Sequence, residues 1–189
     1  MALLNPGSVL DLSLLGVERV PLVPRAVEDD VLELFDRSAP ALLRYVASFG
    51  LGAGEAEDVV QDVFLALFRH LRLDRSRQNL NGWLFRVAHN LALKQRTRIR
   101  RRAAAPLDDT AYRYADPAPN PEVRFAEHER RLRLQPVLAA LPARDRHCLA
   151  LRAEGLRYRE IAEALGMSLG GVAKSLARSL TRLMNADRG

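Results

Sequence analysis

The segment Arg157–Leu183, RYREIAEALGMSLGGVAKSLARSLTRL, has the spacing of two short helices joined by a tight turn. In its first part, apolar side chains recur at helical intervals and predict one buried face: Tyr158, Ile161, Ala162 and Leu165. Gly166 suits the left-handed C-cap of that helix, and Ser168 suits the N-cap of the next one. The segment is therefore expected to form a helix-turn-helix.

The second helix of this segment is predicted to carry a basic outer face. Its inward residues are expected to be Val172, Leu176, Leu180 and Leu183. Its outward residues recur every four positions and are basic: Lys174, Arg178 and Arg182. Insertion into the major groove of DNA needs such a stripe. The alternative is an ordinary helical hairpin with a solvated basic face, and the combined pattern favours the helix-turn-helix.

Composition favours a polyanionic partner. The 189 residues hold 29 Lys and Arg against 23 Asp and Glu, a formal charge of +6 and a sequence pI near 10.2. These numbers alone do not separate nucleic acid from a membrane surface. No apolar run has the length of a spanning helix, and the opening MALLNPGSVLDLSLLGVERV lacks a basic residue before its apolar part. A cytoplasmic protein is expected.

The residues that usually carry catalysis or bind metals are sparse. The only cysteine, Cys148, allows no internal disulfide and no thiolate zinc site, and it is expected to pack as a small apolar residue. The histidines lack the spacing of a metal-binding helix face: His70, His89, His128 and His147. Phosphate-binding glycine loops and nucleophile elbows are also missing. The sequence indicates no enzyme, no metal and no cofactor.

Helical periodicity predicts an all-α fold of two small domains joined by a flexible linker. The ranges are an irregular leader at 1–25, a first domain at 26–102, a linker rich in Ala, Asp and Pro at 103–125, and a second domain at 126–189. The second domain is expected to be a helix-turn-helix of the winged-helix-like kind. Within the first domain, helices are predicted from Ala26, renewed at Pro40, then over 55–71 and from Trp83 to Arg102.

Charge is distributed unevenly along the first domain. Residues 26–68 are rich in Asp and Glu, whereas Asp74 is the sole acid among residues 69–102, which are rich in Arg. Folding does not require such asymmetry. We expect one half to contact a basic partner and the other half a polyanion.

The helix predicted over 55–71 leaves a small acidic and amphipathic patch outside its apolar stripe: Asp58, Gln61, Asp62 and Leu65. A solvated face is the alternative for the acids. An exposed leucine beside them favours a protein interface.

A second candidate site is the loop before Trp83. Asn79 and Asn81 lie there between Arg77 and Trp83. Amides and arginines beside an aromatic ring suit the recognition of unstacked bases. A core position is the more common role for a single tryptophan, so the ring alone does not indicate stacking on a base.

Four motifs together resemble the extracytoplasmic-function group of bacterial RNA polymerase sigma factors. AEDVVQDVFLALF (56–68) and WLFRVAHNLALKQR (83–96) are similar to that family's domain 2. LPARDRHCLALR (141–152) and YREIAEALGMS (158–168) are similar to its domain 4. The order and separation of the two blocks make the resemblance specific.

The resemblance implies four binding contacts and one further partner. Asp58, Gln61 and Asp62 would dock on the clamp helices of the polymerase β′ subunit, and domain 4 would rest on the β flap. The minus-ten promoter element would be bound and opened by Arg77, Gln78, Asn79, Asn81, Arg86, Asn90, Lys94 and Arg96. The minus-thirty-five element would be read by Ser168, Lys174, Ser175, Arg178 and Arg182. An anti-sigma factor is the possible further partner.

The chain departs from the family pattern in two places. His89 stands where the family usually has arginine, and Gly170-Gly171 with Ala173 stand where Thr and Lys are more usual. Each glycine costs a helix roughly 0.8–1 kcal/mol relative to alanine. The first turn of the reading helix is therefore expected to be loosely formed or pressed close to the DNA backbone.

Two other functions are compatible with a helix-turn-helix. A DNA-binding regulator that acts without polymerase would not need the acidic patch, the amide-rich loop and the basic helix of residues 56–96. An enzyme acting on nucleic acid would need clustered metal-binding acids, which the sequence does not show.

Overall fold

The computed structural model describes residues 25–102 and 121–188, and its regular elements in these ranges are all α-helices. The helices are α1 (Arg25–Ala47), α2 (Ala53–Arg72), α3 (Leu80–Arg102), α4 (Pro121–Ala139), α5 (Ala143–Ala153), α6 (Tyr158–Leu165) and α7 (Leu169–Arg188). The all-α prediction is confirmed. A wing would need strands, and the described residues contain none. None of the described helices is both long and apolar enough to cross a membrane.

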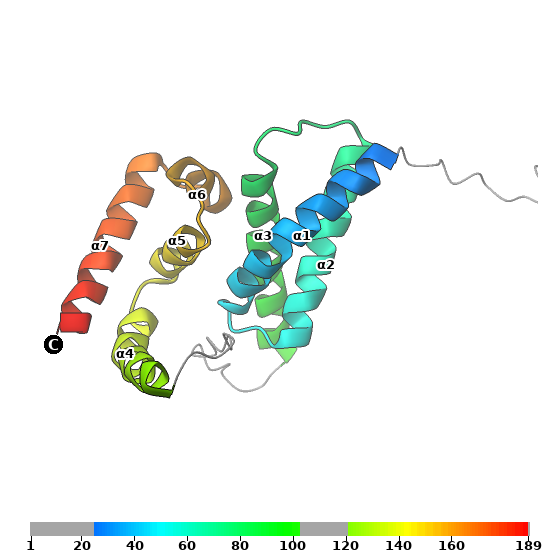
Figure 1. Cartoon of the computed structure of the whole chain (residues 1–189). Coiled ribbons are helices and arrows are strands. Elements are labelled where there is room, and N and C mark those ends of the chain that lie inside the picture. Colours follow the sequence, from blue (N-terminus) through cyan, green and yellow to red (C-terminus); the bar gives the residue numbers. More distant parts are fainter. Residues whose placement is uncertain (1–24, 103–120, 189) are drawn as a thin grey trace, which may run out of the picture.

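Helices α1, α2 and α3 pack on one another around an apolar centre (Figure 1). Its fully buried side chains include Leu42 and Val46 of α1, Val63 and Leu67 of α2, and Leu84 of α3. The expected break at Pro40 was wrong, because α1 runs continuously through the proline. Leu34 and Leu42 are buried on either side of it, and this shared packing keeps the helix intact despite the lost backbone hydrogen bond.

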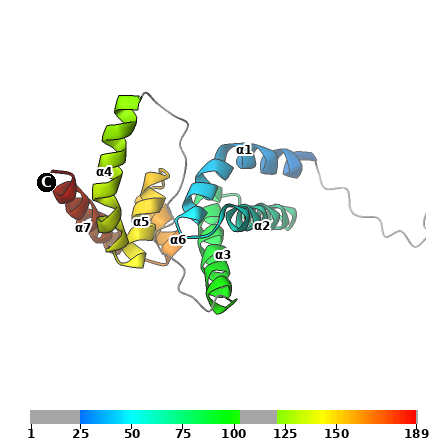
Figure 2. The ribbon, with the colours of Figure 1, turned by 90° about the horizontal axis from the view of Figure 1, so that it is seen from below.

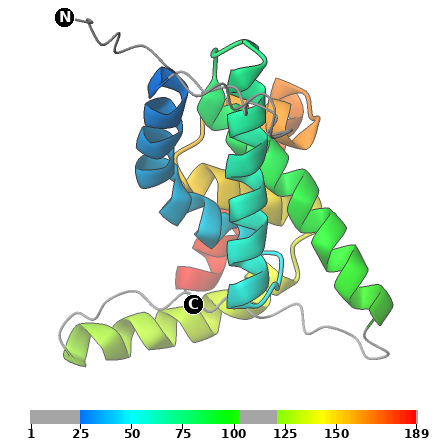
Figure 3. The same ribbon diagram turned by 90° about the vertical axis from the view of Figure 1, so that its right-hand side faces the viewer.

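Asn79 caps the start of α3 in the left-handed region, with φ at 52°. Its side-chain oxygen accepts a hydrogen bond from the backbone N–H of Gly82 at 3.2 Å. A Cβ on Gly82 would lie 2.6 Å from the Asn79 amide nitrogen, so this cap requires glycine there. From this start α3 runs to Arg102, and its C-terminal half projects away from α1 and α2 (Figure 3).

Helices α5 and α6 lie between α3 and α7, with α6 packed on α3 (Figures 1 and 2). Helix α4 packs on α7. It begins at Pro121, so residues 121–125, expected in the linker, are helical. The leader was predicted over 1–25, and its last residue, Arg25, is the first residue of α1. Residues 1–24 and 103–120 lie outside the described residues.

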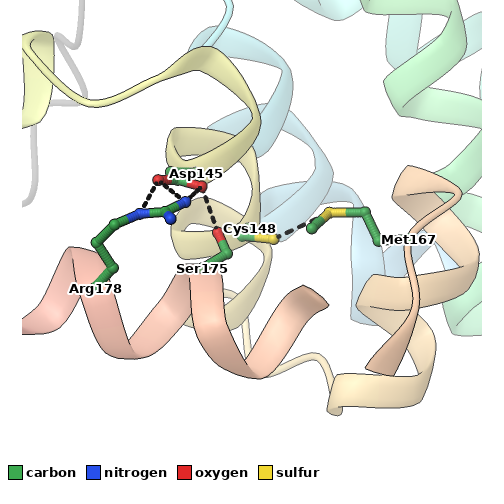
Figure 4. Close-up of polar contacts among 5 residues, drawn as sticks. All are labelled: Asp145, Cys148, Met167, Ser175 and Arg178. Carbon is green, nitrogen blue, oxygen red and sulfur yellow. Dashed lines mark hydrogen bonds and ion pairs between the residues drawn. The ribbon is translucent and has the colours of Figure 1, made fainter. Parts of the chain in front are cut away.

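The predicted turn between α6 and α7 is confirmed. Gly166 follows α6 in the left-handed conformation, with φ at 60°. Ser168 accepts a hydrogen bond from the Gly171 N–H at 3.1 Å, which caps α7. Cys148 is buried, as expected, with its sulfur 3.6 Å from that of Met167 (Figure 4).

The predicted orientation of two apolar residues was wrong. Leu180 is 47% exposed rather than inward, and Tyr158 is 43% exposed, with the Arg152 guanidinium over its ring. Val172 and Leu176 are buried as predicted, but Ser175 and Ser179 complete the buried face of α7. Helix α7 is therefore rotated about its axis relative to the expectation.

Asp145 of α5 explains this rotation (Figure 4). Its side chain is 4% exposed, and it accepts a hydrogen bond from the Ser175 hydroxyl at 2.7 Å. The Arg178 guanidinium donates to both carboxylate oxygens at 2.7–3.0 Å. A buried carboxylate needs such partners, so α7 turns its donors toward α5.

Asp145→Ala should lower the free energy of unfolding by about 2–3 kcal/mol in urea titrations, because Ser175 loses its buried acceptor and Arg178 its counter-ion. The matched control is Asp36→Ala on α1, an exposed acid whose loss should cost less than about 0.5 kcal/mol. Equal effects of the two substitutions would contradict the structural role of Asp145.

His89 is a buried base in the middle of α3. Its Nδ1 lies 2.8 Å from the Tyr45 hydroxyl, and burial lowers the pKa of His89 from 6.5 to about 4. Burial also raises the pKa of Tyr45, so the hydroxyl stays protonated and donates to the neutral imidazole. The fold thus holds His89 uncharged at neutral pH.

The stability that His89 contributes should be fully present above pH 6.5 and fall between pH 6.5 and 4, by up to about 1.4 kcal/mol per pH unit. The reason is that the unfolded chain binds a proton there and the folded chain does not. His89→Gln keeps an acceptor for Tyr45 without titrating, so its unfolding free energy should depend less on pH in this range. A pH profile parallel to that of the parent would exclude this contribution.

Candidate nucleic-acid and protein interfaces

The acidic patch lies on the exposed side of α2, opposite the buried Val59, Val63 and Leu67. All four predicted residues are exposed there, and Leu65 is 52% exposed: Asp58, Gln61, Asp62 and Leu65. Their shared face is as predicted. Their contact with another protein stays a prediction.

Two exposed apolar residues on α1 were not identified as interface candidates from the sequence. Leu32 is 61% exposed and Phe35 is 43% exposed. The Phe35 ring lies 4.9 Å from that of Phe64, the residue before Leu65. Exposed apolar side chains are therefore present on both α1 and α2, which pack on each other.

The loop before α3 makes more intramolecular contacts than its sequence indicates. Arg77 forms an ion pair with Asp30 of α1. Asn79 caps α3 and also donates from Nδ2 to a carboxylate oxygen of Glu163, on α6, at 2.9 Å. The side chains of Gln78 and Asn81 are exposed. Within the described residues the Asn81 side chain makes no hydrogen bond, so its amide is more accessible than that of Asn79.

Helix α3 carries an exposed stripe in which Arg86, Asn90 and Lys94 recur at four-residue intervals. Arg96 is half-buried. Beyond it a shallow hollow is lined by Leu93, Lys94, Thr97, Arg98, Arg101 and Arg102. Since Asp74 is the only acid from 69 to 102, this face presents positive charge without nearby acids of its own segment. It can bind a polyanion.

The outer face of α7 has fewer free side chains than predicted. Ser168, Lys174 and Arg182 are exposed. Ser175 is 2% exposed and bound to Asp145, so its predicted contact with DNA was wrong. Arg178 keeps a side chain 47% exposed, but its guanidinium is held by Asp145.

The glycines at the start of α7 are helical, so this turn is formed rather than loose. A Cβ on Gly170 would meet nothing within 4 Å, whereas one on Gly171 would approach the Ser168 hydroxyl at 3.1 Å. The surface at Gly170 is therefore open and flat enough for close approach of another backbone.

A ring cluster between α3, α5 and the end of α1 was also missed from the sequence. Phe49 stacks on His147 with centroids 4.4 Å apart, and His89 lies 5.0 Å from His147. Nothing in the spacing of 49, 89 and 147 indicates that they meet. Among residues 25–102 and 121–188, no group of three His, Cys, Asp or Glu could hold a metal ion.

The chain matches two family models, sigma-70 region 2 over residues 34–103 and sigma-70 region 4 over residues 131–183. The first match contains α2, the loop and α3, and the second contains α5, α6 and most of α7. The acidic patch of α2, the loop, the stripe of α3 and the outer face of α7 thus lie inside the matched regions.

The chain is 34% identical over 175 residues to the ECF RNA polymerase sigma factor ShbA of Streptomyces griseus subsp. griseus, covering 86% of this chain and 91% of that protein. It is 32% identical over 155 residues to the ECF sigma factor SigE of Mycolicibacterium smegmatis, covering 80% of this chain and 59% of that relative's length.

The fold is similar to that of the sigma factor RpoE from Bartonella quintana, solved in complex with the anti-sigma factor NepR. The TM-score is 0.64 at 22% identity, with 83% of this chain and 96% of that chain covered. With both regions matched in order and a relative of 34% identity matched over 91% of its length, the chain belongs to the extracytoplasmic-function group of bacterial RNA polymerase sigma factors.

Proposed function

We propose that this sigma factor, a transcription initiation factor that directs RNA polymerase to promoters, uses separate faces for its two partners. The exposed face of α2 would bind the polymerase core, and α3 and α7 would bind promoter DNA. The observation that carries this assignment is the division of charge between two adjacent helices, with an acidic outer face on α2 and a basic one on α3. We further propose that the chain acts in the cytoplasm and has no catalysis of its own.

On the polymerase side, Asp58 and Asp62 lie four residues apart on α2, with Gln61 and Leu65 beside them. A protein partner suits this face because it combines charge with an exposed leucine. The β′ clamp helices are the proposed partner, and the β flap is the proposed partner of the second domain.

On the minus-ten side, we propose that Arg86, Asn90 and Lys94 follow the DNA backbone while Asn81 meets an unstacked base. The arginine and lysine supply charge to the phosphates, and an amide can pair with a base edge. Arg77, Gln78, Asn79 and Arg96 remain proposed contacts. Arg77 and Asn79 would have to release Asp30 and Glu163 first.

On the minus-thirty-five side, Lys174 is the exposed basic side chain in the N-terminal half of α7, the part that reaches bases first in a helix-turn-helix. We propose that it reads a base edge, beside the open surface at Gly170. Ser168, Arg178 and Arg182 would contact the backbone, with Arg178 oriented by Asp145.

A regulator that acts without polymerase is not favoured, because residues 34–103 match sigma-70 region 2 in addition to the helix-turn-helix region. The Bartonella quintana relative was solved with the anti-sigma factor NepR. We propose that an anti-sigma factor is a partner of this chain too.

The parent chain should support run-off transcription with purified core polymerase, and the double variant Asp58→Lys, Asp62→Lys should not. Reversing two exposed charges should weaken core binding at least about tenfold, equivalent to ~1.4 kcal/mol, without changing the helical content. Glu28→Lys, Asp29→Lys makes the same charge change on α1 and serves as the control. Equal core affinity of the two double variants would refute the assignment of α2.

Lys174→Ala should weaken binding of the holoenzyme to the minus-thirty-five element by about 1–3 kcal/mol at one base position, because a base-edge contact is lost there. The measurement is affinity for matched and singly substituted promoters across a salt series, with Arg37→Ala on α1 as the control. A uniform loss with a salt slope smaller by about 0.9 would instead indicate a phosphate contact. Parental affinity on every promoter would exclude Lys174 from the interface.

A further inference from the structure

The two domains of this chain are packed against each other rather than held apart. Buried side chains of α1, α2 and α3 form one continuous apolar cluster with those of α5, α6 and α7. Figures 1 and 2 show α5 and α6 beside α3 from two directions. The contact between the domains is therefore buried and apolar, like the interior of a single domain.

The centre of this contact is a set of buried rings. Phe49 follows α1, His89 is in α3 and His147 is in α5, and each is less than a tenth exposed. Phe49 stacks on His147 with centroids 4.4 Å apart, and His89 lies 5.5 Å from Phe49 and 5.0 Å from His147. Such packing contributes beyond the burial of area.

Two polar contacts flank the rings. Arg44 donates to both carboxylate oxygens of Glu154, which follows α5, at 2.6–3.1 Å. The Glu154 side chain is 9% exposed, so this fork is shielded from water. Asn79 donates to Glu163 of α6 at 2.9 Å. A buried apolar centre with polar contacts around it is the anatomy of a specific interface.

The Glu163 contact occupies a group proposed to bind DNA. Its carboxylate accepts from the Asn79 amide, as a phosphate oxygen or a base acceptor would. The stripe of Arg86, Asn90 and Lys94 stays exposed. The packed arrangement thus occupies the Asn79 amide at the start of α3 and leaves the backbone-binding stripe open.

The packed arrangement is also too short for a promoter. Elements centred near minus ten and minus thirty-five are about 25 base pairs apart, or about 85 Å along B-DNA. Helix α7 starts at Leu169, six residues after Glu163, so its first turn lies within about 30 Å of Asn79 by chain reach. One packed molecule cannot contact both elements at once.

We propose that the surface formed by Arg44, Phe49, Asn79 and His89 is a docking site for α5 and α6 of the same chain, and that docking and promoter binding exclude one another. The exclusion rests on the proposed DNA-binding roles of α3 and α7. Residues 103–120 join the domains, and 18 residues reach at most ~60 Å when extended. Together with the lengths of α3 and α7, about 35 and 30 Å, this reach suffices for the open form.

The test is a charge-reversal cycle on the fork. Arg44→Glu faces Glu154 with like charge and should open the free chain, as should Glu154→Arg. The double variant Arg44→Glu, Glu154→Arg should close it again. Small-angle X-ray scattering measures the outcome, since a compact chain of 189 residues has a radius of gyration of about 16 Å and two separated domains approach ~25 Å.

Opening should also favour promoter binding. With core polymerase present, the single reversals should tighten binding to a promoter that carries both elements, by several-fold up to about tenfold, because the parent must first release its docked domain. Glu163→Ala removes an exposed carboxylate with no effect on the fold expected, and should raise the affinity of the holoenzyme for a pre-melted minus-ten template. Glu33→Arg, Arg37→Glu swaps an exposed ion pair within α1 and should change neither quantity.

The outcomes separate this inference from the proposed function. Compact single-reversal variants, or expanded ones whose affinity for a promoter with both elements equals that of the parent, would overturn the docking proposal while the parent still transcribes. If the parent binds neither core polymerase nor promoter, the proposed function fails instead. Expanded single variants that are restored to parental size and affinity in the double variant support the docking site.

Discussion

The buried carboxylate of Asp145 is the constraint on which the arrangement of the second domain depends. It lies in the first turn of α5, away from solvent, and its hydrogen-bonding needs are met by Ser175 and Arg178 on α7. A buried charge that is left unpaired costs several kcal/mol, so only one rotation of α7 about its axis is acceptable. That rotation brings Ser175 inside, turns Leu180 outward and leaves Lys174 on the surface.

In the first domain the corresponding constraint is the amphipathic character of α2 and α3. Each helix buries one apolar face in the shared core, and what remains outside differs in charge. Among the described residues, Asp58 and Asp62 of α2 form no ion pair with Arg86 or Lys94 of α3, and the nearby pair of Arg77 with Asp30 joins the loop to α1. Surface charge kept in this way is available to partners and contributes little to stability.

The contact between the domains involves side chains that also have another structural or proposed binding role. Asn79 caps α3 through Oδ1, binds Glu163 through Nδ2 and is also a proposed DNA contact. His89, where the family resemblance predicted arginine, is buried and neutral beside Tyr45 and His147. An arginine there would place a permanent charge among these rings, so the histidine is the residue compatible with this packing.

The sequence by itself determined the features that depend on near neighbours in the chain. Helical periodicity identified the all-α fold, Gly166 and Ser168 identified the turn, and residues 56–68 and 83–96 with the helix-turn-helix identified the family. Caps, turns and amphipathic faces are set within a few residues, which is why a single sequence reveals them. The outward face of α2 followed from the same periodicity.

Only the tertiary structure decided which side chains are free. Three contacts join residues far apart in the chain: Ser175 with Asp145, Asn79 with Glu163, and Phe49 with His147. Helical periodicity cannot predict that a serine is buried because a carboxylate far away in the sequence needs a hydrogen-bond donor. The continuous helix through Pro40 has the same origin, since packing on α2 and α3 outweighed a local preference.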